Sequence, residues 1–186
     1  APLGVAEDTE GSIRVPAALC GLAGFRPTTG RYSTEGAVPI SSLFDQVGPH
    51  ARTVTDLVLF DAVAAADARP IAPQKLKGVK LAVPRGYFFA GLDPEVEHLT
   101  EAALEKLRLA GVELVEADIP DLETLIGLIT DQVQNHDVRI ELAKYLETYR
   151  AGISYDELLA KASDDIRAIF ARDVMPGGSG FVSEQV

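Results

Sequence analysis

The sequence predicts an α/β fold, because segments typical of strands and helices alternate along it. The clearest case is a strand–helix–strand unit. Val79–Val83 has the alternation and β-branching of a strand, and a helix begins at Asp93-Pro94 with apolar residues at helical spacing. Gly111 ends this helix, and Val112–Ala117 alternates again. Because right-handed crossovers join neighbouring parallel strands, we expect these two strands to pair in parallel.

Further elements are expected on both sides of this unit. They are a helix at Arg14–Cys20 ended by Gly21, a buried strand at Leu22–Phe25, a long irregular segment at Thr28–Pro49, a helix from a Thr53 cap to about Ala66, one long or two joined helices at Leu122–Arg150, and a helical stretch at Tyr155–Phe170 split near Ser163-Asp164. Loops as long as Thr28–Pro49 are usually functional, and ordinary turn chemistry is the alternative.

A proline-containing stretch at 67–74 has the composition of a linker. It separates residues 1–66, which hold the serine turn, the long loop and a helix, from residues 75–186, which hold the strand–helix–strand unit and later helices. We expect both parts to belong to one partial domain spanning 1–186.

Composition excludes several classes of partner. With 186 residues and 47% hydrophobic content, the chain can bury a substantial core. A net charge of -11 argues against binding to nucleic acid or to an anionic membrane, because both would repel the protein. The single cysteine, Cys20, permits no internal disulfide and fits a reducing, cytoplasmic location. We find no metal-ligand or cofactor motif and expect neither group.

The residues around Ser12 are the strongest candidate for a chemical site. Gly11-Ser12 lies just before the expected helix at Arg14–Cys20. Backbone N–H groups at a helix start have no intrahelical acceptor and can stabilise developing negative charge. Ser12 can then be a nucleophile, or it can be a plain N-cap, which is the commonest role for serine at this position.

Other titratable residues form weaker patterns. His98 and His136 lack partners at useful spacing, and His50 has no paired carboxylate, so a Ser-His-Asp triad is not expected. For Asp8, a charge-assisted pair with Arg14 that pins the serine turn is favoured over catalysis.

Many spaced positions together resemble the amidase signature family. The first stretch is Gly4-x-Ala6-x-Asp8-x-x-x-Ser12-Ile13-Arg14-x-Pro16-Ala17, followed by Cys20-Gly21-Leu22-Ala23-Gly24-Phe25-Arg26-Pro27-Thr28-x-Gly30-Arg31 and Asp45-Gln46-Val47-Gly48-Pro49. This resemblance implies a mixed β-sheet flanked by helices on both faces and a Ser-cisSer-Lys triad. Ser12 maps onto the nucleophile, and the backbone N–H groups of Thr9, Glu10, Gly11 and Ser12 map onto the oxyanion hole.

The resemblance also implies the substrate class. It predicts a serine amidohydrolase that cleaves the C–N bond of a carboxamide through an acyl-enzyme. Two stretches, Glu7-Asp8-Thr9 before the serine turn and Leu43-Phe44-Asp45, resemble the branch of the family that hydrolyses arylacetamides such as mandelamide and indoleacetamide. We expect Ser41, Leu43 and Phe44 to line part of the substrate pocket, together with the helix beginning near Leu122.

Two departures from the family pattern stand out. The bridging serine and the lysine of the triad lie upstream in the family, and no lysine precedes Lys75 here. We therefore expect an internal fragment that is inactive without the N- and C-terminal parts of its own enzyme. The alternative is a non-catalytic fragment that self-associates as a homo-oligomer through exposed sheet edges or apolar faces.

The second departure is Glu10, where the family pattern has glycine or alanine. Glutamate adds bulk and a negative charge beside the expected oxyanion site. We expect it to lower amidase activity or to mark an altered or engineered pocket.

Overall fold

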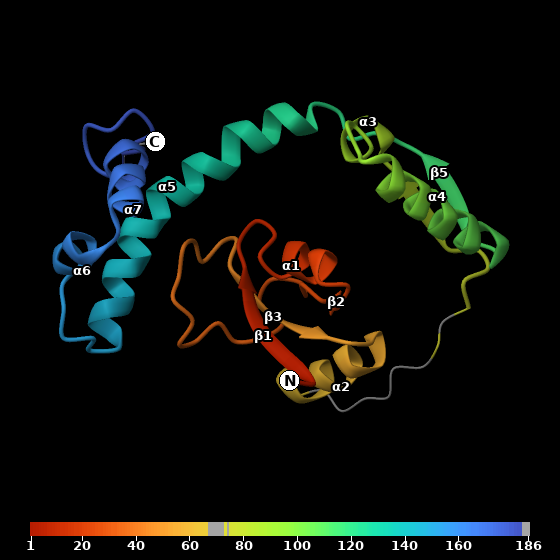
Figure 1. The fold of residues 1–186 in the computed structure, drawn as a ribbon, viewed down its shortest axis with the longest axis horizontal. Coiled ribbons are helices and arrows are strands. Elements are labelled where there is room, and N and C mark those ends of the chain that lie inside the picture. The colour runs from red at the N-terminus through yellow and green to blue at the C-terminus, as the bar shows by residue number, and fades with distance from the viewer. Residues whose placement is uncertain (67–72, 74, 184–186) are drawn as a thin grey trace. The chain divides into compact units, whose positions relative to one another are not determined.

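The computed structural model describes residues 1–66, 73 and 75–183, and divides the chain into two compact units. The first unit is Ala1–Pro70 with Thr130–Val186, and the second is Ile71–Ile129. The helices after Thr130 thus belong with the N-terminal residues, whereas the sequence-based division had grouped 75–186. Most of the predicted linker, 67–72 and 74, lies outside the described residues. The predicted α/β class is confirmed, with both antiparallel and parallel strand pairs (Figure 1).

The first unit contains a three-stranded antiparallel sheet in the order β1-β3-β2. Its strands are β1 (Leu3–Asp8), β2 (Ala23–Gly24) and β3 (Gln46–Ala51). Strands β1 and β3 pair along their whole length, from Leu3 opposite Ala51 to Asp8 opposite Gln46. The turn that carries Ser12 therefore leaves the sheet at the end where β3 begins.

The expectation of an irregular segment through Pro49 was wrong at its C-terminal end. The loop stops at Asp45, and Gln46–Ala51 is the central strand. Its Gly and Pro residues are typical of turns, but Gly48 is needed for close packing. A Cβ there would lie 2.2 Å from the Phe25 carbonyl oxygen and 2.6 Å from the Ile13 side chain. Strand β1, rich in small residues, was not predicted either.

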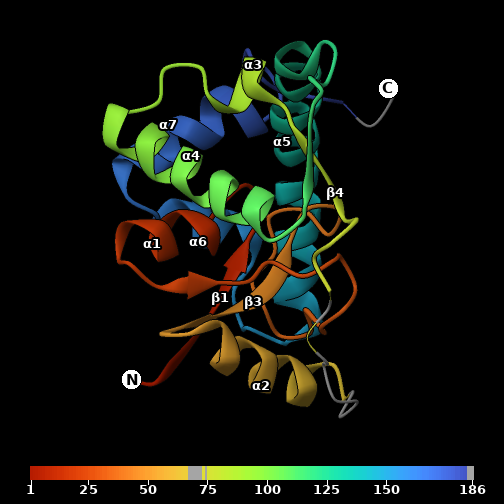
Figure 2. The same ribbon diagram turned by 90° about the vertical axis from the view of Figure 1, so that its right-hand side faces the viewer.

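Two helices lie on opposite sides of these strands (Figures 1 and 2). Helix α1 (Arg14–Leu19) ends as predicted, with Gly21 in the left-handed region at φ +63°. Helix α2 (Val54–Ala64) begins as predicted, because the Thr53 side chain accepts a hydrogen bond from the Asp56 N–H. The buried residues Ile13, Ala17, Ala51 and Leu57 form the core of this region.

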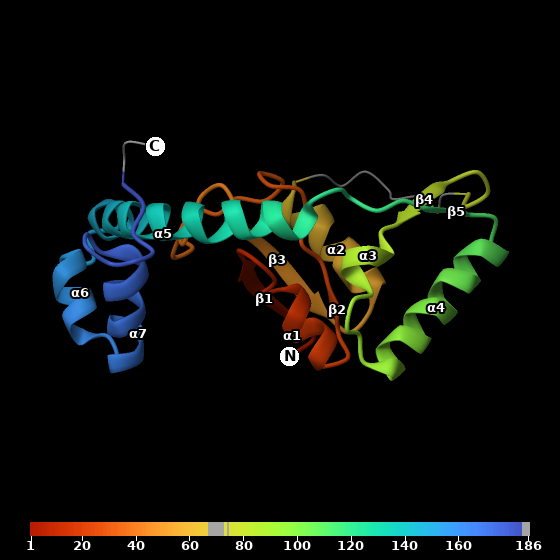
Figure 3. The ribbon, with the colours of Figure 1, turned by 90° about the horizontal axis from the view of Figure 1, so that it is seen from above.

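The second unit confirms the strand–helix–strand prediction. It contains β4 (Lys80–Val83), α3 (Arg85–Phe88), α4 (Pro94–Leu109) and β5 (Glu113–Glu116). Strands β4 and β5 are parallel and lie side by side (Figure 3). Asp93 caps α4 by accepting from the Glu95 N–H, and Gly111 follows the helix at φ +95°.

The C-terminal helices also follow the sequence pattern. Helix α5 (Leu122–Thr148) is one long helix, and α6 (Tyr155–Lys161) and α7 (Asp164–Ile169) are separate, as the predicted split requires. Ser154 and Glu157 form a capping box at the start of α6, and a π-helical turn, η1 (Phe170–Val174), follows α7. Among the described residues, no helix is long and apolar enough to cross a membrane.

The close packing around Gly48 predicts that Gly48→Ala destabilises the protein. The added methyl group would overlap the Phe25 carbonyl, so we expect the free energy of unfolding to fall by about 2 kcal/mol or more in urea denaturation. Gly4→Ala is the matched control in the paired strand, because its Cβ would meet only His50 Cβ at 3.8 Å. Equal stability of the two variants would contradict this account.

Candidate active site

Ser12 lies in the turn between β1 and α1 and is exposed. It borders an open depression whose lining is Glu10, Gly11, Ser12, Val15 and Pro16. The alternative role as a helix cap does not hold. The N-cap position of α1 is Ile13, with no side-chain cap, and the Ser12 hydroxyl forms no hydrogen bond within the described part of the chain. The hydroxyl is therefore open to solvent at the edge of the depression.

The carboxylate of Asp8 takes the place of a helix cap. Its Oδ2 accepts hydrogen bonds from the backbone N–H groups of Ile13 at 3.1 Å and Arg14 at 3.4 Å. The Arg14 guanidinium binds the same carboxylate through Nε at 3.1 Å and Nη2 at 3.2 Å. Asp8 thus ties the last residue of β1 to the first turn of α1, and the chain between them is held as a tight turn.

Arg26 adds a second cation to Asp8. Its Nη1 donates to Asp8 Oδ1 at 3.0 Å and to the Asp8 carbonyl, while its Nη2 donates to the Phe44 carbonyl at 2.7 Å. Burial alone would raise the pKa of Asp8, but the hydrogen bonds from Arg14 and from the Ile13 N–H outweigh it and lower the pKa below its usual range. Asp8 therefore stays ionised at neutral pH although its side chain is fully buried.

The turn presents a row of backbone donors beside Ser12. Within the described residues, the N–H groups of Thr9, Glu10, Gly11 and Ser12 have no hydrogen-bond acceptor. The carbonyls of the turn are used instead: Gly11 accepts from the Val15 N–H at 2.7 Å, and Glu10 accepts from Arg14 Nη2 at 3.0 Å. Unpaired N–H groups next to a free hydroxyl are the arrangement that stabilises an oxyanion.

The Glu10 side chain is exposed and lines the same depression as Ser12. Its carboxylate has no hydrogen-bond or ion-pair partner among the residues that the structure describes. A free negative charge therefore lies close to the row of donors.

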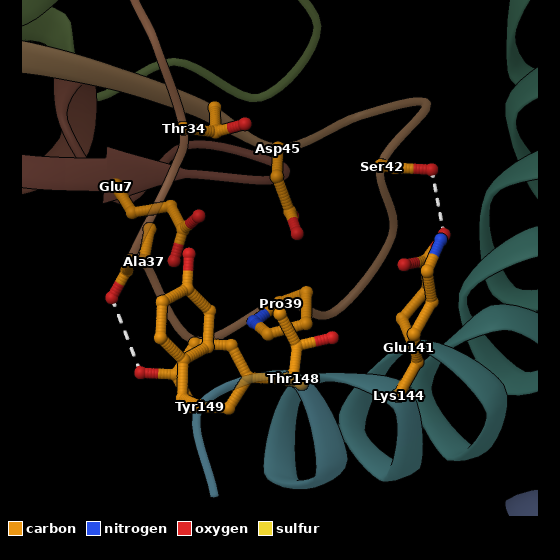
Figure 4. A pocket seen from close by; sticks show the side chains of 12 residues that line it. Glu7, Thr34, Ala37, Pro39, Ser42, Asp45, Glu141, Lys144, Thr148 and Tyr149 are labelled. Atoms are coloured by element: carbon orange, nitrogen blue, oxygen red, sulfur yellow. Dashed lines mark hydrogen bonds between the residues drawn. The ribbon is translucent and has the colours of Figure 1, made fainter.

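The predicted pocket residues Ser41, Leu43 and Phe44 have different environments. Ser41 is buried, and its hydroxyl donates to Asp137 Oδ2 on α5 at 2.5 Å. Leu43 is 61% exposed, and the Phe44 carbonyl accepts from Arg26. A neighbouring cavity of about 210 Å³ is lined by other residues of this loop, Ser42 and Asp45, and by the C-terminal part of α5, at Glu141 and Lys144 (Figure 4).

Figure 4 shows how the loop and α5 meet around this cavity. Ser42 Oγ donates to Glu141 Oε1 at 2.7 Å, and the Tyr145 hydroxyl donates to the Gly36 carbonyl at 3.2 Å. Glu7 also lines the cavity, and its pKa is raised by burial and by the nearby charge of Asp45.

The histidines have structural environments. His50, on β3, donates from Nε2 to the Ile13 carbonyl at 2.7 Å, and His136 contacts the adjacent Asp137 at 2.9 Å. His98 is exposed. The sequence analysis placed Asp45 in the expected pocket loop and Arg26 in a stretch that resembles the family, but it predicted neither the contact of Arg26 with Asp8 nor that of Asp45 with Thr9.

The buried Asp8 ion pair predicts a pH-dependent loss of stability. In Asp8→Asn we expect the free energy of unfolding at pH 7 to fall by about 2 kcal/mol, a value discounted because Arg14 is partly exposed. Because folding lowers the pKa of Asp8, the wild type holds this contribution above about pH 4 and loses it as pH falls through the lowered pKa. The difference between the two proteins should therefore shrink in acid.

Thermal denaturation between pH 2.5 and 7 measures this difference. Asp164→Asn is the control, since it removes an ion pair with Arg167 in which Asp164 is 96% exposed, and we expect an effect below about 0.5 kcal/mol. A gap for Asp8→Asn that stays constant with pH would contradict the assignment.

Comparisons with known proteins agree with this geometry. The family model described as Amidase matches residues 1–175. The chain is 37% identical over 185 residues to mandelamide hydrolase of Pseudomonas putida, covering 99% of this chain and 36% of that protein. It is 38% identical over 161 residues to indoleacetamide hydrolase of Allorhizobium ampelinum, covering 87% of this chain and 35% of that protein.

A solved structure gives the same result. The peptide amidase from Stenotrophomonas maltophilia superposes with a TM-score of 0.69 and 26% sequence identity, covering 86% of this chain and 36% of that one. The chain thus spans about a third of the length of these relatives. The family match covers nearly the whole chain and shows that it belongs to the amidase family.

Proposed function

We propose that Ser12 is the nucleophile of a serine amidohydrolase that cleaves the C–N bond of a carboxamide. The observation that carries this proposal is the row of unpaired backbone N–H groups from Thr9 to Ser12, adjoining a serine hydroxyl without a hydrogen-bond partner. The two relatives at 37% and 38% identity, a mandelamide hydrolase and an indoleacetamide hydrolase, support an arylacetamide as the substrate.

In this mechanism the Ser12 oxygen attacks the carbonyl carbon of the amide, and its proton passes through a general base to the leaving nitrogen. The carbonyl oxygen becomes an oxyanion that accepts hydrogen bonds from the turn. The amine or ammonia leaves, and water hydrolyses the acyl-Ser12 ester to the acid. The family resemblance assigns the base to a lysine acting through a second serine, both of which precede the nucleophile in the family pattern.

The turn has the properties that this step requires. Backbone donors that are already held in place stabilise developing charge without reorganisation, and one such donor is typically worth about 3 kcal/mol of barrier. The unpaired N–H groups from Thr9 to Ser12 support this role for the turn. Asp8 keeps the turn in place from inside the protein, where its two arginine partners neutralise its charge. One exposed free cysteine, Cys20, supports a reducing compartment such as the cytoplasm as the place of action.

Substitution of the proposed nucleophile tests the assignment. In the full-length protein in which these residues occur, Ser12→Ala should lower phenylacetamide hydrolysis by roughly 10,000-fold or more, since loss of a serine nucleophile removes the covalent route. Ser154→Ala is the control, because this serine only caps α6. If the wild-type enzyme is quenched during turnover, mass spectrometry of the acyl-enzyme should find the acyl group on the peptide containing Ser12. Acylation elsewhere would refute the proposal.

We propose that the negative charge of Glu10 repels the developing oxyanion and so raises the barrier to hydrolysis. Two unit charges a few ångströms apart interact by ~1 kcal/mol in water, so we expect Glu10→Gly to raise kcat on phenylacetamide by about 5-fold. Glu10→Gln separates charge from size and should give most of this gain, which should diminish as ionic strength increases. Unchanged turnover in both variants would contradict this role for Glu10.

A further inference from the structure

Asp45 is a buried carboxylate at the C-terminal end of the long loop, directly before β3. Its side chain accepts three hydrogen bonds from distant or loop residues, and only 4% of the residue is exposed. Oδ1 accepts from the Thr9 hydroxyl at 2.7 Å, and Oδ2 accepts from the N–H groups of Ile40 at 2.7 Å and Ser41 at 2.9 Å. Thr9 is the first residue of the donor row, so Asp45 connects the loop to the serine turn.

The position of Asp45 is fixed without any help from Thr9. The N–H groups of Phe44 and Asp45 both donate to the Ser41 carbonyl, at 3.0 and 2.7 Å, which closes a compact turn around the carboxylate. The next residue, Gln46, is fully buried at the start of the central strand and accepts from the Gly30 N–H at 3.0 Å. Because the residues on both sides of Asp45 are held in place, its carboxylate can fix the position of the Thr9 hydroxyl.

Contacts to α5 brace the same loop. Ser42 donates to Glu141 (Figure 4). The preceding residue, Ser41, donates to Asp137, so two consecutive hydroxyls attach the loop to the helix. The Thr9 hydroxyl therefore bonds to a carboxylate whose own position is set by a strand, a turn and a helix of the same unit.

The donor row is thus held at its two ends by different carboxylates. At the C-terminal end, Asp8 binds the N–H groups of Ile13 and Arg14. At the N-terminal end, Asp45 binds the Thr9 side chain. We propose that Asp45 is a positioning residue that acts through the Thr9 hydroxyl to aim the first N–H groups of the row at the oxyanion. This inference rests on the proposed function of Ser12.

The carboxylate is suited to this role by its number of acceptors. All three partners of Asp45 are donors, and a carboxylate offers two oxygens that only accept. An asparagine can keep both loop contacts through its one oxygen and donate from its NH₂ group to the Thr9 hydroxyl oxygen, because a hydroxyl also accepts. Asp45→Ala removes both oxygens and therefore breaks the connection to Thr9.

The test measures amide hydrolysis in the full-length protein. Thr9→Val keeps the β-branched shape and removes only the hydroxyl, and we expect kcat on phenylacetamide to fall about 10-fold, with KM changed by less than about 2-fold. This loss is smaller than the 100-fold or more typical when an oxyanion donor is removed outright, because the N–H groups remain. Thr9→Ser, which retains the hydroxyl, should stay within about 2-fold of the wild type.

Double-mutant analysis assigns the effect to one connection. If Thr9 and Asp45 act as a pair, kcat of Thr9→Val/Asp45→Ala should equal that of Asp45→Ala alone. Thr53→Val is the matched control, since the Thr53 hydroxyl also donates to an aspartate, Asp56, at 2.8 Å, but next to the opposite end of β3. It should lower thermal stability through loss of the α2 cap and leave kcat unchanged.

Two results would overturn the positioning role. One is a lowered melting temperature with unchanged kcat in Thr9→Val, and the other is additive losses of kcat in the double variant. A separate readout applies if the wild type hydrolyses no carboxamide, which would refute the proposed function itself. With selective ¹⁵N-threonine labelling, the Thr9 order parameter should then still fall from near 0.85 to below about 0.7 in Asp45→Ala. An unchanged value would refute the connection as well.

Discussion

The buried carboxylate of Asp8 is the interaction on which the serine turn depends. It ends β1, replaces the missing side-chain cap of α1 and binds two arginines from different parts of the chain. A buried ion pair is costly unless its hydrogen-bonding capacity is filled, and here both oxygens are fully used. The consequence is a turn that keeps its place although Ser12 and its neighbouring N–H groups have no hydrogen-bond partner among the described residues, as the proposed function requires.

The same principle explains the composition of the surrounding sheet. The turn is held close to β3 only because the chain packs tightly there, with Gly48 facing the Phe25 carbonyl and Gly24 facing the Ala17 methyl group. A Cβ at either glycine would enter occupied space. Gly24 thus allows β2 to approach α1, and Gly48, in the strand that the sequence did not predict, allows β3 to approach Ile13 and Phe25.

The arrangement of charge around the turn is asymmetric. The cations Arg14 and Arg26 are engaged with Asp8, and Asp45 is engaged with neutral donors, whereas the carboxylate of Glu10 is free among the described residues. The charged side chains that hold the turn are thus paired with opposite charges or with hydrogen-bond donors. The unpaired carboxylate of Glu10, in contrast, borders the depression beside Ser12. Under the proposed function, this contrast places the free carboxylate of Glu10 at the depression that an amide would enter.

The sequence by itself determined the elements with local signals. Caps at Thr53 and Asp93, stops at Gly21 and Gly111, and apolar periodicity in the second unit predicted α1, α2, α4 and the parallel pair β4 and β5. It also predicted the pairing of Asp8 with Arg14, because six residues across a tight turn bring the two together. Tertiary structure alone decided the central strand and the long-range partners Arg26 and Asp45, which lie 18 and 36 residues from Asp8 and Thr9. Such contacts depend on sheet register and on the path of a long loop, and neither leaves a periodic signal in the local sequence.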